Sequence, residues 1–408
     1  MTPKREIVTW CIINIAPIIV WTFHLCQVGF PGIYTLLNHT DAPQYTAVGD
    51  WLFGGVYTSY VSTRTYLFPL FLILVKKLFG LQSFFIVQSL LWLGSVNFIY
   101  ASIHRILKQP MLAAGFSLIF ILNLSILSMT YEVLTETVTI FFCSLLIWII
   151  TGINSFRDVQ IKSGVILLIV SVLTLMKPIF EPLFVLFLLA TVFLFFRKPE
   201  IRTRKNISWC VAAILLIGVQ LFISVKYTGT FSISGVGNLT VRGYLIAQTY
   251  CHSHFDQIME ARRVVWQMSL GELMQFCIAN FPELMRNYIH HLHFNISSYP
   301  SEASAINSPR FELEFMVWWN KFHWLAQLAL PVLLIFSAKK IFRDESLRWK
   351  SILLALFMYE IVLVIGVSYG QGDRLVLPAI PFAFALYAII LKVFFLKRQN
   401  SIQKFTAP

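Results

Sequence analysis

Seven acidic and basic side chains stand near the ends of apolar segments in a chain that carries few charges elsewhere. They are Asp41, Glu132, Glu136, Lys177, Glu181, Asp373 and Arg374. Ionisable groups at or within a bilayer are costly and usually persist where a pathway or a site uses them. When the apolar segments are oriented by the positive-inside rule, all seven fall at the same, non-cytoplasmic face. We therefore expect them to form a single site.

Asp41 follows the first apolar segment and precedes Ala42-Pro43. A carboxylate at this place could take a proton from the hydroxyl or amine of an acceptor as that group attacks a sugar carbon. An aspartate before Ala-Pro is also a favoured helix N-cap. The loop alone leaves both interpretations open.

Glu132 and Glu136 are four positions apart at the start of an apolar segment. In a helix this spacing puts both on one face, where either could hydrogen-bond a substrate or bind a cation. The alternative is that they are first-turn acids, stabilised by the helix dipole.

Arg374 follows a glycine-rich turn, and Lys177 precedes a proline. Arginine suits a phosphate because its planar fork makes two parallel, charge-assisted hydrogen bonds, and Lys177 could add a second positive charge. The prolines after Lys177 and Glu181 interrupt helix, and unwound backbone at membrane depth is tolerated where it lines a cavity. The alternatives are an ordinary outer turn at Lys177 and an interfacial anchor, or a pair with Asp373, at Arg374.

The amino-acid composition is typical of a membrane protein. Of its 408 residues, 57% are hydrophobic and 12% are charged, about half the charged fraction of a soluble domain. The net charge of +13 comes from basic clusters in short loops between apolar runs, which is the cytoplasmic signature of a plasma or inner membrane protein. The lipid bilayer is thus an expected partner, and nucleic acid is not.

The apolar pattern predicts one all-α membrane domain, 1–408, with ten transmembrane helices. The predicted spans are 7–29, 82–104, 111–130, 133–152, 163–176, 179–196, 207–227, 323–338, 351–369 and 375–395. Residues 66–79 are too short for a comfortable span, so we expect a helix at the outer interface. Two extracytoplasmic loop regions remain, 30–81 and 228–322, and helical spacing in 270–293 of the second predicts a half-buried helix.

Cysteines and histidines of the second loop region offer two further possibilities. Cys251 and Cys277 share that region, where an oxidising compartment would permit a disulfide. Histidines near 252 and 291 are metal ligands by residue type, but neither group has a recognised spacing. We assign no metal ligand and no cofactor, and a divalent metal stays possible.

Short motifs spread over most of the chain resemble the GT-C membrane glycosyltransferases, in the branch of bacterial protein mannosyltransferase-like and aminoarabinose transferase-like enzymes. The matching motifs are Asp41-x-x-x-Tyr45 with Gly49 and Gly54-Gly55, Arg64-x-x-x-x-Pro69, Phe79-Gly80, Thr135-Glu136, Lys177-Pro178 and Gly372-Asp-Arg374-x-x-x-Pro378-x-x-Pro381. Their order and their common side of the membrane carry the resemblance. The chain departs from the pattern by lacking a clear Asp-Glu pair in the first loop, where Asp50 is a weaker candidate than Asp41.

The resemblance implies a polyprenyl-phosphate-linked sugar donor and transfer outside the cytoplasm, at a bacterial inner membrane, to a glycan, lipid or protein acceptor. Asp41 would be the general base, and Arg374 with Lys177 or Arg64 would hold the lipid phosphate. Substrate-binding residues would come from Tyr45, Glu132, Glu136, Glu181 and Asp373.

Two other functions remain open. A surface-polysaccharide polymerase or ligase would rely on a pair of arginines in its long outer loop, which Arg262-Arg263 could supply. A transporter or flippase would place charges near the bilayer midplane, and Glu360 lies well inside the ninth predicted span.

Overall fold

The structure is a computed structural model that describes residues 3–38, 41–254, 257–297, 309–369 and 372–396. Within these ranges every regular element is a helix and no strand is present. An all-helical structure suits a lipid environment, because a helix satisfies its backbone hydrogen bonds within one segment. The prediction of an all-α polytopic membrane protein is confirmed.

The first half of the chain alternates long helices with short ones. The helices are α1 (Pro3–Asn14), α2 (Ala16–Leu37), α3 (Ala42–Leu52), α4 (Leu67–Phe79), α5 (Phe84–Leu107), α6 (Pro110–Ile121), α7 (Leu124–Ser128), α8 (Glu136–Thr151), α9 (Phe156–Met176), α10 (Glu181–Arg197) and α11 (Arg204–Thr228). Short 3-10 turns join several of them: η1 (Ser59–Ser62), η2 (Leu81–Ser83), η3 (Met129–Tyr131), η4 (Pro178–Phe180) and η5 (Pro199–Ile201).

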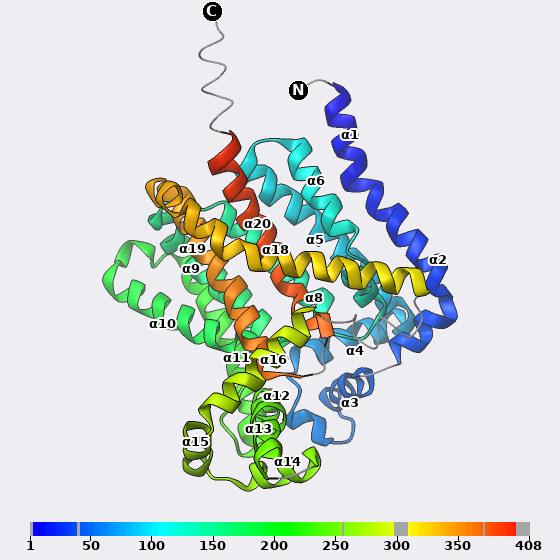
Figure 1. Ribbon diagram of the computed structural model, residues 1–408, viewed down its shortest axis with the longest axis vertical. Helices are drawn as coiled ribbons and strands as arrows, with labels where there is room; N and C mark the ends of the chain where they lie inside the picture. The colour runs from blue at the N-terminus through cyan, green and yellow to red at the C-terminus, as the bar shows by residue number, and fades with distance from the viewer. Residues whose placement is uncertain (1–2, 39–40, 255–256, 298–308, 370–371, 397–408) are drawn as a thin grey trace, which may run out of the picture.

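The second half begins with short helices and ends with three longer ones. They are α12 (Gly235–Thr240), the π-helix η6 (Val241–Ile246), α13 (Ala247–His254), α14 (Ile258–Gln267), α15 (Leu270–Ala279), α16 (Phe281–Ser297), α18 (Arg310–Arg343), α19 (Glu345–Val364), η7 (Ile365–Val367), η8 (Gly372–Leu375), η9 (Leu377–Ala379), α20 (Ile380–Leu391) and η10 (Lys392–Leu396). In Figure 1, α3 and α13–α15 lie at one end of the molecule, and α1 and the end of α20 lie at the other.

Eight helices of the described residues are long and apolar enough to cross a membrane, or nine if a bent pair is counted as one span. Each of the ten predicted segments falls on helix, but the count of ten is not confirmed. α8 has 16 residues, fewer than the roughly 20 that a span needs. The predicted span 111–130 is the bent pair, in which α6 and the segment Leu124–Tyr131 meet at 59°. The break falls at Asn123, whose side chain accepts a hydrogen bond from the Ile126 amide and so begins a new helix.

Helix boundaries around the two predicted outer regions differ from the sequence prediction. α2 continues past residue 29 to Leu37 across a kink at Gly29, and α18 begins at Arg310, so that residues 310–322 extend the predicted span. The helix predicted over 270–293 is wrong as a single element, because α15 ends at Ala279 and α16 begins at Phe281. Pro282 explains the break, since it has no amide hydrogen to continue the α15 ladder. Helix α4 is present, and its place at the interface stays a prediction.

The helices differ in how much of their apolar surface is buried by other helices. In the last candidate span, Leu377–Phe394, 78% of the apolar window is buried, against 17% in Arg310–Arg343. Helices α10, α11 and α18 expose large apolar side chains, among them Phe196, Phe222 and Ile335. Large exposed apolar side chains on helices of this length suit contact with lipid rather than water.

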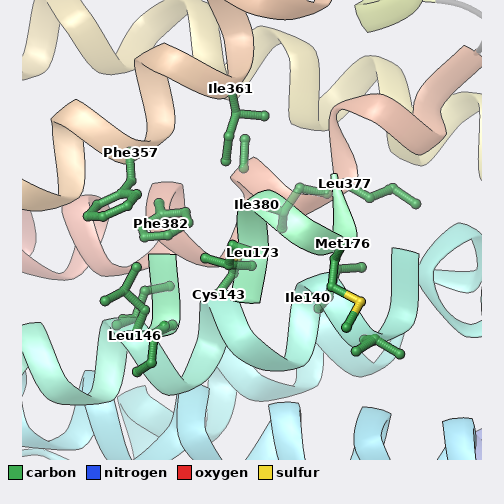
Figure 2. Packing of buried hydrophobic residues seen from close by; sticks show 14 of the residues in the cluster. Ile140, Cys143, Leu146, Leu173, Met176, Phe357, Ile361, Leu377, Ile380 and Phe382 are labelled. Atoms are coloured by element: carbon green, nitrogen blue, oxygen red, sulfur yellow. The ribbon is translucent and has the colours of Figure 1, made fainter. Parts of the chain in front are cut away.

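Part of the core lies between α8, α9, α19 and α20, as Figure 2 shows. Phe357 of α19 stacks on Phe382 of α20 with 5.5 Å between ring centres, and on Phe187 of α10 at 5.3 Å. Packing at interior density holds helix ends firmly in place. The start of α8 and the end of α9, which carry Glu136 and Lys177, are fixed by this core.

Candidate active site

A pocket of about 620 Å³ lies where six stretches of the chain meet. Its walls come from residues within 41–65, 135–136, 176–181, 234–244, 364–368 and 374–375. These include the start of α8, the break between α9 and η4, and the turn before α20. Helix ends and irregular backbone therefore build most of the wall, as is expected where unwound backbone borders a cavity.

Asp41 is held by two arginines. It stands at the N-cap position of α3, but its side chain makes no capping hydrogen bond. One carboxylate oxygen, Oδ1, lies 2.7 Å from Arg64 Nη2, and the other, Oδ2, lies 3.5 Å from Arg374 Nη2. The N-cap alternative thus accounts for the position of Asp41 but not for the contacts of its carboxylate.

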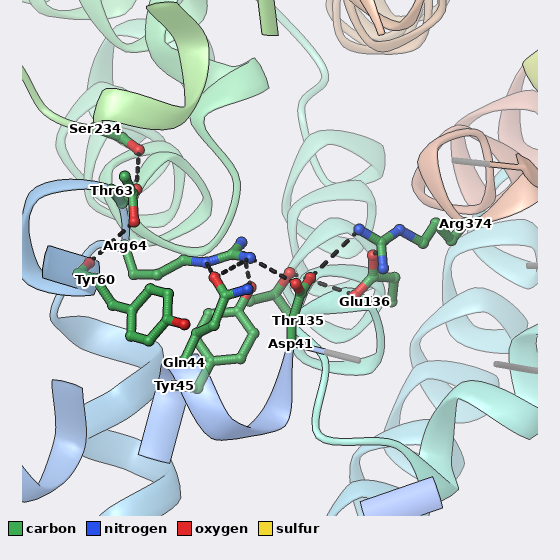
Figure 3. Close-up of polar contacts among 10 residues, drawn as sticks. All are labelled: Asp41, Gln44, Tyr45, Tyr60, Thr63, Arg64, Thr135, Glu136, Ser234 and Arg374. Carbon is green, nitrogen blue, oxygen red and sulfur yellow. Dashed lines mark hydrogen bonds and ion pairs between the residues drawn. The ribbon is translucent and has the colours of Figure 1, made fainter. Parts of the chain in front are cut away.

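Arg64 is fixed by a set of neighbours on α3. Its Nε and Nη2 donate to Gln44 Oε1 at 3.0 and 2.8 Å, and its Nη1 donates to the Tyr45 hydroxyl at 3.3 Å. The guanidinium also lies 4.8 Å from the centre of the Tyr45 ring. Figure 3 shows how these side chains point toward one another. Arg64 is therefore oriented before any substrate arrives.

A second group of charges lies at the start of α8. Lys177 Nζ is 3.0 Å from Glu136 Oε1, and Arg374 Nε is 3.7 Å from the same oxygen. The Glu136 side chain is 3% exposed and that of Lys177 is 8% exposed, whereas those of Arg374 and Asp41 are 18% exposed. Pro178 disfavours helix at Lys177, so the backbone there is extended. The carboxylate of Glu136 also sits in the first turn of α8, where the helix dipole favours it.

The charges alternate in sign along one continuous row. The order is Arg64, Asp41, Arg374, Glu136 and Lys177, which gives three cations to two carboxylates. Glu181 lines the same pocket and belongs to no ion pair of the described residues. Arg374 is the cation of this row that contacts both carboxylates. An anion that enters the pocket would therefore compete with Asp41 and Glu136 for Arg374.

The site also shifts the acid–base behaviour of its members. Burial raises the pKa of Tyr45 to about 12, with opposing effects from Arg64 and Asp41. Burial lowers the pKa of Lys177, against the attraction of Glu136. Burial opposes the charge of Arg374, but Glu136 and Asp41 outweigh it and raise its pKa. Tyr45 stays a neutral hydroxyl and Arg374 a cation at physiological pH.

The raised pKa of Tyr45 predicts a loss of stability in alkali. Between its ordinary value of 10.0 and about 12, the unfolded chain gives up this proton while the folded chain keeps it. Stability due to Tyr45 is thus complete below pH 10 and falls as the pH rises. At pH 11 the wild type should have lost about 1.4 kcal/mol from this group. The measurement is the free energy of unfolding in micelles for wild type and Tyr45→Phe from pH 9 to 11. A variant curve that falls as steeply as that of the wild type would contradict the assignment.

Seven of the predicted site residues line the pocket. They are Asp41, Tyr45, Arg64, Glu136, Lys177, Glu181 and Arg374. Glu132 does not line it, and its prediction needs correcting: it lies in extended backbone before α8, not one turn below Glu136 on a helix. The Gln88 side chain donates hydrogen bonds to the backbone carbonyls of Thr130 and Glu132. These carbonyls thus have a partner in a segment where the regular helix is interrupted. The side chain of Asp373 lies outside the described residues.

Two features of the structure were missing from the prediction. Gln44, which bridges Arg64 to α3, lies three residues after Asp41, so helical spacing could have indicated it. His24 of α2 and Glu312 of α18 form a fully buried pair, with Nδ1 and Oε2 3.0 Å apart. They are 288 positions apart, and no local pattern in the sequence signals such a partner.

The cysteines and histidines of the second loop region make ordinary protein contacts. Cys251 and Cys277 are both free thiols, so the possible disulfide is not formed. His291 Nε2 lies 2.6 Å from Gln248 Oε1, and burial lowers the pKa of this imidazole to about 4. Among the residues that the structure describes, no group of three or more His, Cys, Asp or Glu side chains could hold a metal ion.

No model of a known protein family matches the chain, and no curated protein sequence matches it.

Proposed function

We propose that this protein is a membrane glycosyltransferase that moves a sugar from a polyprenyl-phosphate donor to an acceptor. The observation that carries the proposal is the shared ion pair of Asp41 with Arg64 and Arg374 on the wall of a pocket that also holds Lys177. It puts a carboxylate that can accept a proton beside cations that can bind a phosphate. The group that would accept the proton and Arg374, a cation that would bind the phosphate, are then in direct contact.

In the proposed reaction Asp41 takes the proton of the acceptor hydroxyl or amine. The acceptor atom forms a bond to the anomeric carbon of the sugar, and the bond from that carbon to the phosphate oxygen breaks. The electron pair leaves with the polyprenyl phosphate, on which negative charge builds up. Arg374 and Lys177 stabilise that charge, because cations that already line the pocket need little reorganisation during the reaction.

Arg374 is the arginine best placed to change partners. Its contacts to Asp41 and Glu136 are 3.5 and 3.7 Å long, whereas Arg64 holds Asp41 at 2.7 Å. A donor phosphate that takes over Arg374 would loosen one oxygen of Asp41. That oxygen would then be free to accept the proton of an acceptor.

The pocket also has an apolar side. Met176, Ile179 and Val364 line it together with the polar residues. An isoprenoid chain next to a phosphate needs such a wall. The arrangement suits a substrate with a charged head and an apolar tail.

Arg374→Lys should weaken donor use about ten- to a hundredfold, because the ammonium keeps the charge but loses the two-pronged hydrogen bond. The effect should fall mainly on KM for the donor. Steady-state kinetics in liposomes measures it, with Arg310→Lys as the control, since the Arg310 side chain is 92% exposed and pairs only with Glu314 among the described residues. An unchanged KM for Arg374→Lys would remove Arg374 from the phosphate site.

A polymerase or ligase is the runner-up, and the position of its arginines separates it from the proposal. Neither Arg262 nor Arg263 lines the pocket; Arg262 Nε donates to the Gly243 carbonyl of the π-helix η6 at 2.7 Å. The experiment that tests the proposed function compares sugar transfer by Asp41→Asn and by Arg263→Ala. We expect transfer to be lost in the first variant and kept in the second. The opposite result would replace the transferase by a polymerase.

The alternative function of a transporter depends on Glu360. Both of its carboxylate oxygens are buried and have no hydrogen-bond partner among the described residues. It does not line the pocket, although Val364, one helical turn further along α19, does. Glu360→Gln should leave sugar transfer intact if the chain is a transferase, and measuring that transfer tests this alternative.

A further inference from the structure

A cluster of basic side chains lies at the end of α8 opposite the pocket. α8 starts at Glu136, in the pocket wall, and ends at Thr151, about 24 Å away at 1.5 Å per residue. Arg105, Lys162 and Lys350 approach the segment that follows α8, and we call these three, with the nearby Lys108, the basic cluster. They belong to α5, α9 and α19, which are far apart in the sequence.

Two cations of the basic cluster meet at Gly152. A methyl group placed on this glycine would lie 2.8 Å from Arg105 Nη1 and 3.1 Å from Lys162 Nζ. Arg105 donates to the Trp148 carbonyl and Lys162 to the Gly152 carbonyl, both at 2.8 Å. The last carbonyls of a helix attract cations, so helix capping explains these two contacts.

Helix capping does not explain Lys350. This lysine is 6% exposed, and among the described residues its ammonium donates to two neutral oxygens, Ser346 Oγ at 2.7 Å and Asn154 Oδ1 at 3.5 Å. Among the described residues, Lys392, Lys108 and Arg105 are close enough to repel it, and Asp344 is close enough to attract it. A buried ammonium among like charges is costly unless an anion pairs with it.

The nearby acids are engaged in backbone contacts. Asp158 accepts from the Asn154 amide at 2.7 Å, Asp344 caps α19 through the Leu347 amide at 3.2 Å, and Glu345 accepts from the Phe156 amide at 3.1 Å. The ion pairs within 4.0 Å among the described residues include none of Arg105, Lys108, Lys162 and Lys350. In this part of the chain the basic cluster therefore has several donors and no carboxylate within ion-pair distance.

We propose that the basic cluster binds a phosphate group, carried by an anionic membrane lipid or free in solution. Phosphate oxygens accept several charge-assisted hydrogen bonds at once, which is what converging ammonium and guanidinium groups offer. The basic loops at this end are those that the sequence predicts to be cytoplasmic, where anionic lipid headgroups attract basic side chains. The inference does not depend on the reaction proposed for the pocket.

Native mass spectrometry of the full-length protein in detergent tests the inference. The probes are phosphatidylglycerol, phosphatidylcholine as the zwitterionic control, and inorganic phosphate, whose effect is read as a shift in the thermal unfolding midpoint. The variants are Lys350→Met and Lys108→Gln; Lys108 is exposed, so its replacement does not disturb the core. Lys205→Met is the control, because it removes one exposed basic charge from the first turn of α11, outside the basic cluster.

We expect phosphatidylglycerol to bind the wild type at least about tenfold more tightly than phosphatidylcholine, a difference of about 1.4 kcal/mol. Lys350→Met should lose this preference, Lys108→Gln should weaken it and Lys205→Met should keep it. If phosphate alone stabilises the wild type and not Lys350→Met, and the two lipids bind equally, the ligand is free phosphate. If neither probe distinguishes Lys350→Met from Lys205→Met, the inference is overturned and the cluster only caps α8.

Discussion

Asp41→Asn should abolish sugar transfer while leaving the protein folded. Asparagine keeps an oxygen that can accept from Arg64, but it cannot take a proton. Loss of a general base usually costs a factor of about 10² to 10⁴ in turnover, and we expect the upper part of that range because the described pocket offers no second carboxylate in contact with both arginines. Initial rates with a saturating donor measure the effect.

Asp50→Asn is the matched control for this experiment. Asp50 lies in the same helix, α3, and its side chain is 51% exposed and 3.5 Å from Lys76. The same chemical change there should leave turnover within about twofold of the wild type, since exposed pairs contribute little. Full activity of Asp41→Asn, or an equal loss in Asp50→Asn, would rule out Asp41 as the base.

Glu136→Ala should be the most destabilising single change in the site. It leaves Lys177 buried without its partner and removes one of the two carboxylates that hold Arg374. Breaking a buried ion pair by removing one member typically costs about 3–5 kcal/mol. Chemical unfolding in micelles measures the loss, and Glu314→Ala is the control, because its pair with Arg310 is exposed.

A double variant separates stability from chemistry at this pair. Glu136→Leu with Lys177→Met replaces both buried charges by apolar groups, which is often neutral for stability. We expect the double variant to be more stable than Glu136→Ala but to lose sugar transfer, because the donor phosphate has lost Lys177. A double variant that transfers sugar at the wild-type rate would show that the pair is structural only.

Much of the site could be predicted because charge is scarce in this chain. In an apolar sequence, each acid or base near a helix end is conspicuous, and sidedness alone put Asp41, Lys177 and Arg374 at one face. The identity of their partners could not be predicted in the same way. Asp41 and Arg374 are 333 positions apart, and which carboxylate meets which guanidinium depends on how α3, α8 and the turn before α20 are packed.

The fold was predictable where hydropathy decides it and not where single residues do. Apolar segments gave the long helices, since lipid leaves the backbone little choice. Local capping and proline chemistry set the breaks: Asn123 divides α6 from α7, and Pro282 divides α15 from α16. Hydropathy also could not tell that α18 begins at Arg310, because its first turns carry Glu312, which is buried against His24. Such a pairing satisfies a charge only once both helices are in place.

The release of polyprenyl phosphate from a polyprenyl-phosphate sugar by the purified protein in liposomes tests the central claim most directly. A panel of donors with different sugars should be offered together with an extract of envelope acceptors, and the freed lipid phosphate should be counted. We predict release by the wild type with at least one donor, and none above background by Asp41→Asn. Absence of release with every donor, or release that Asp41→Asn supports equally well, would contradict the proposed function.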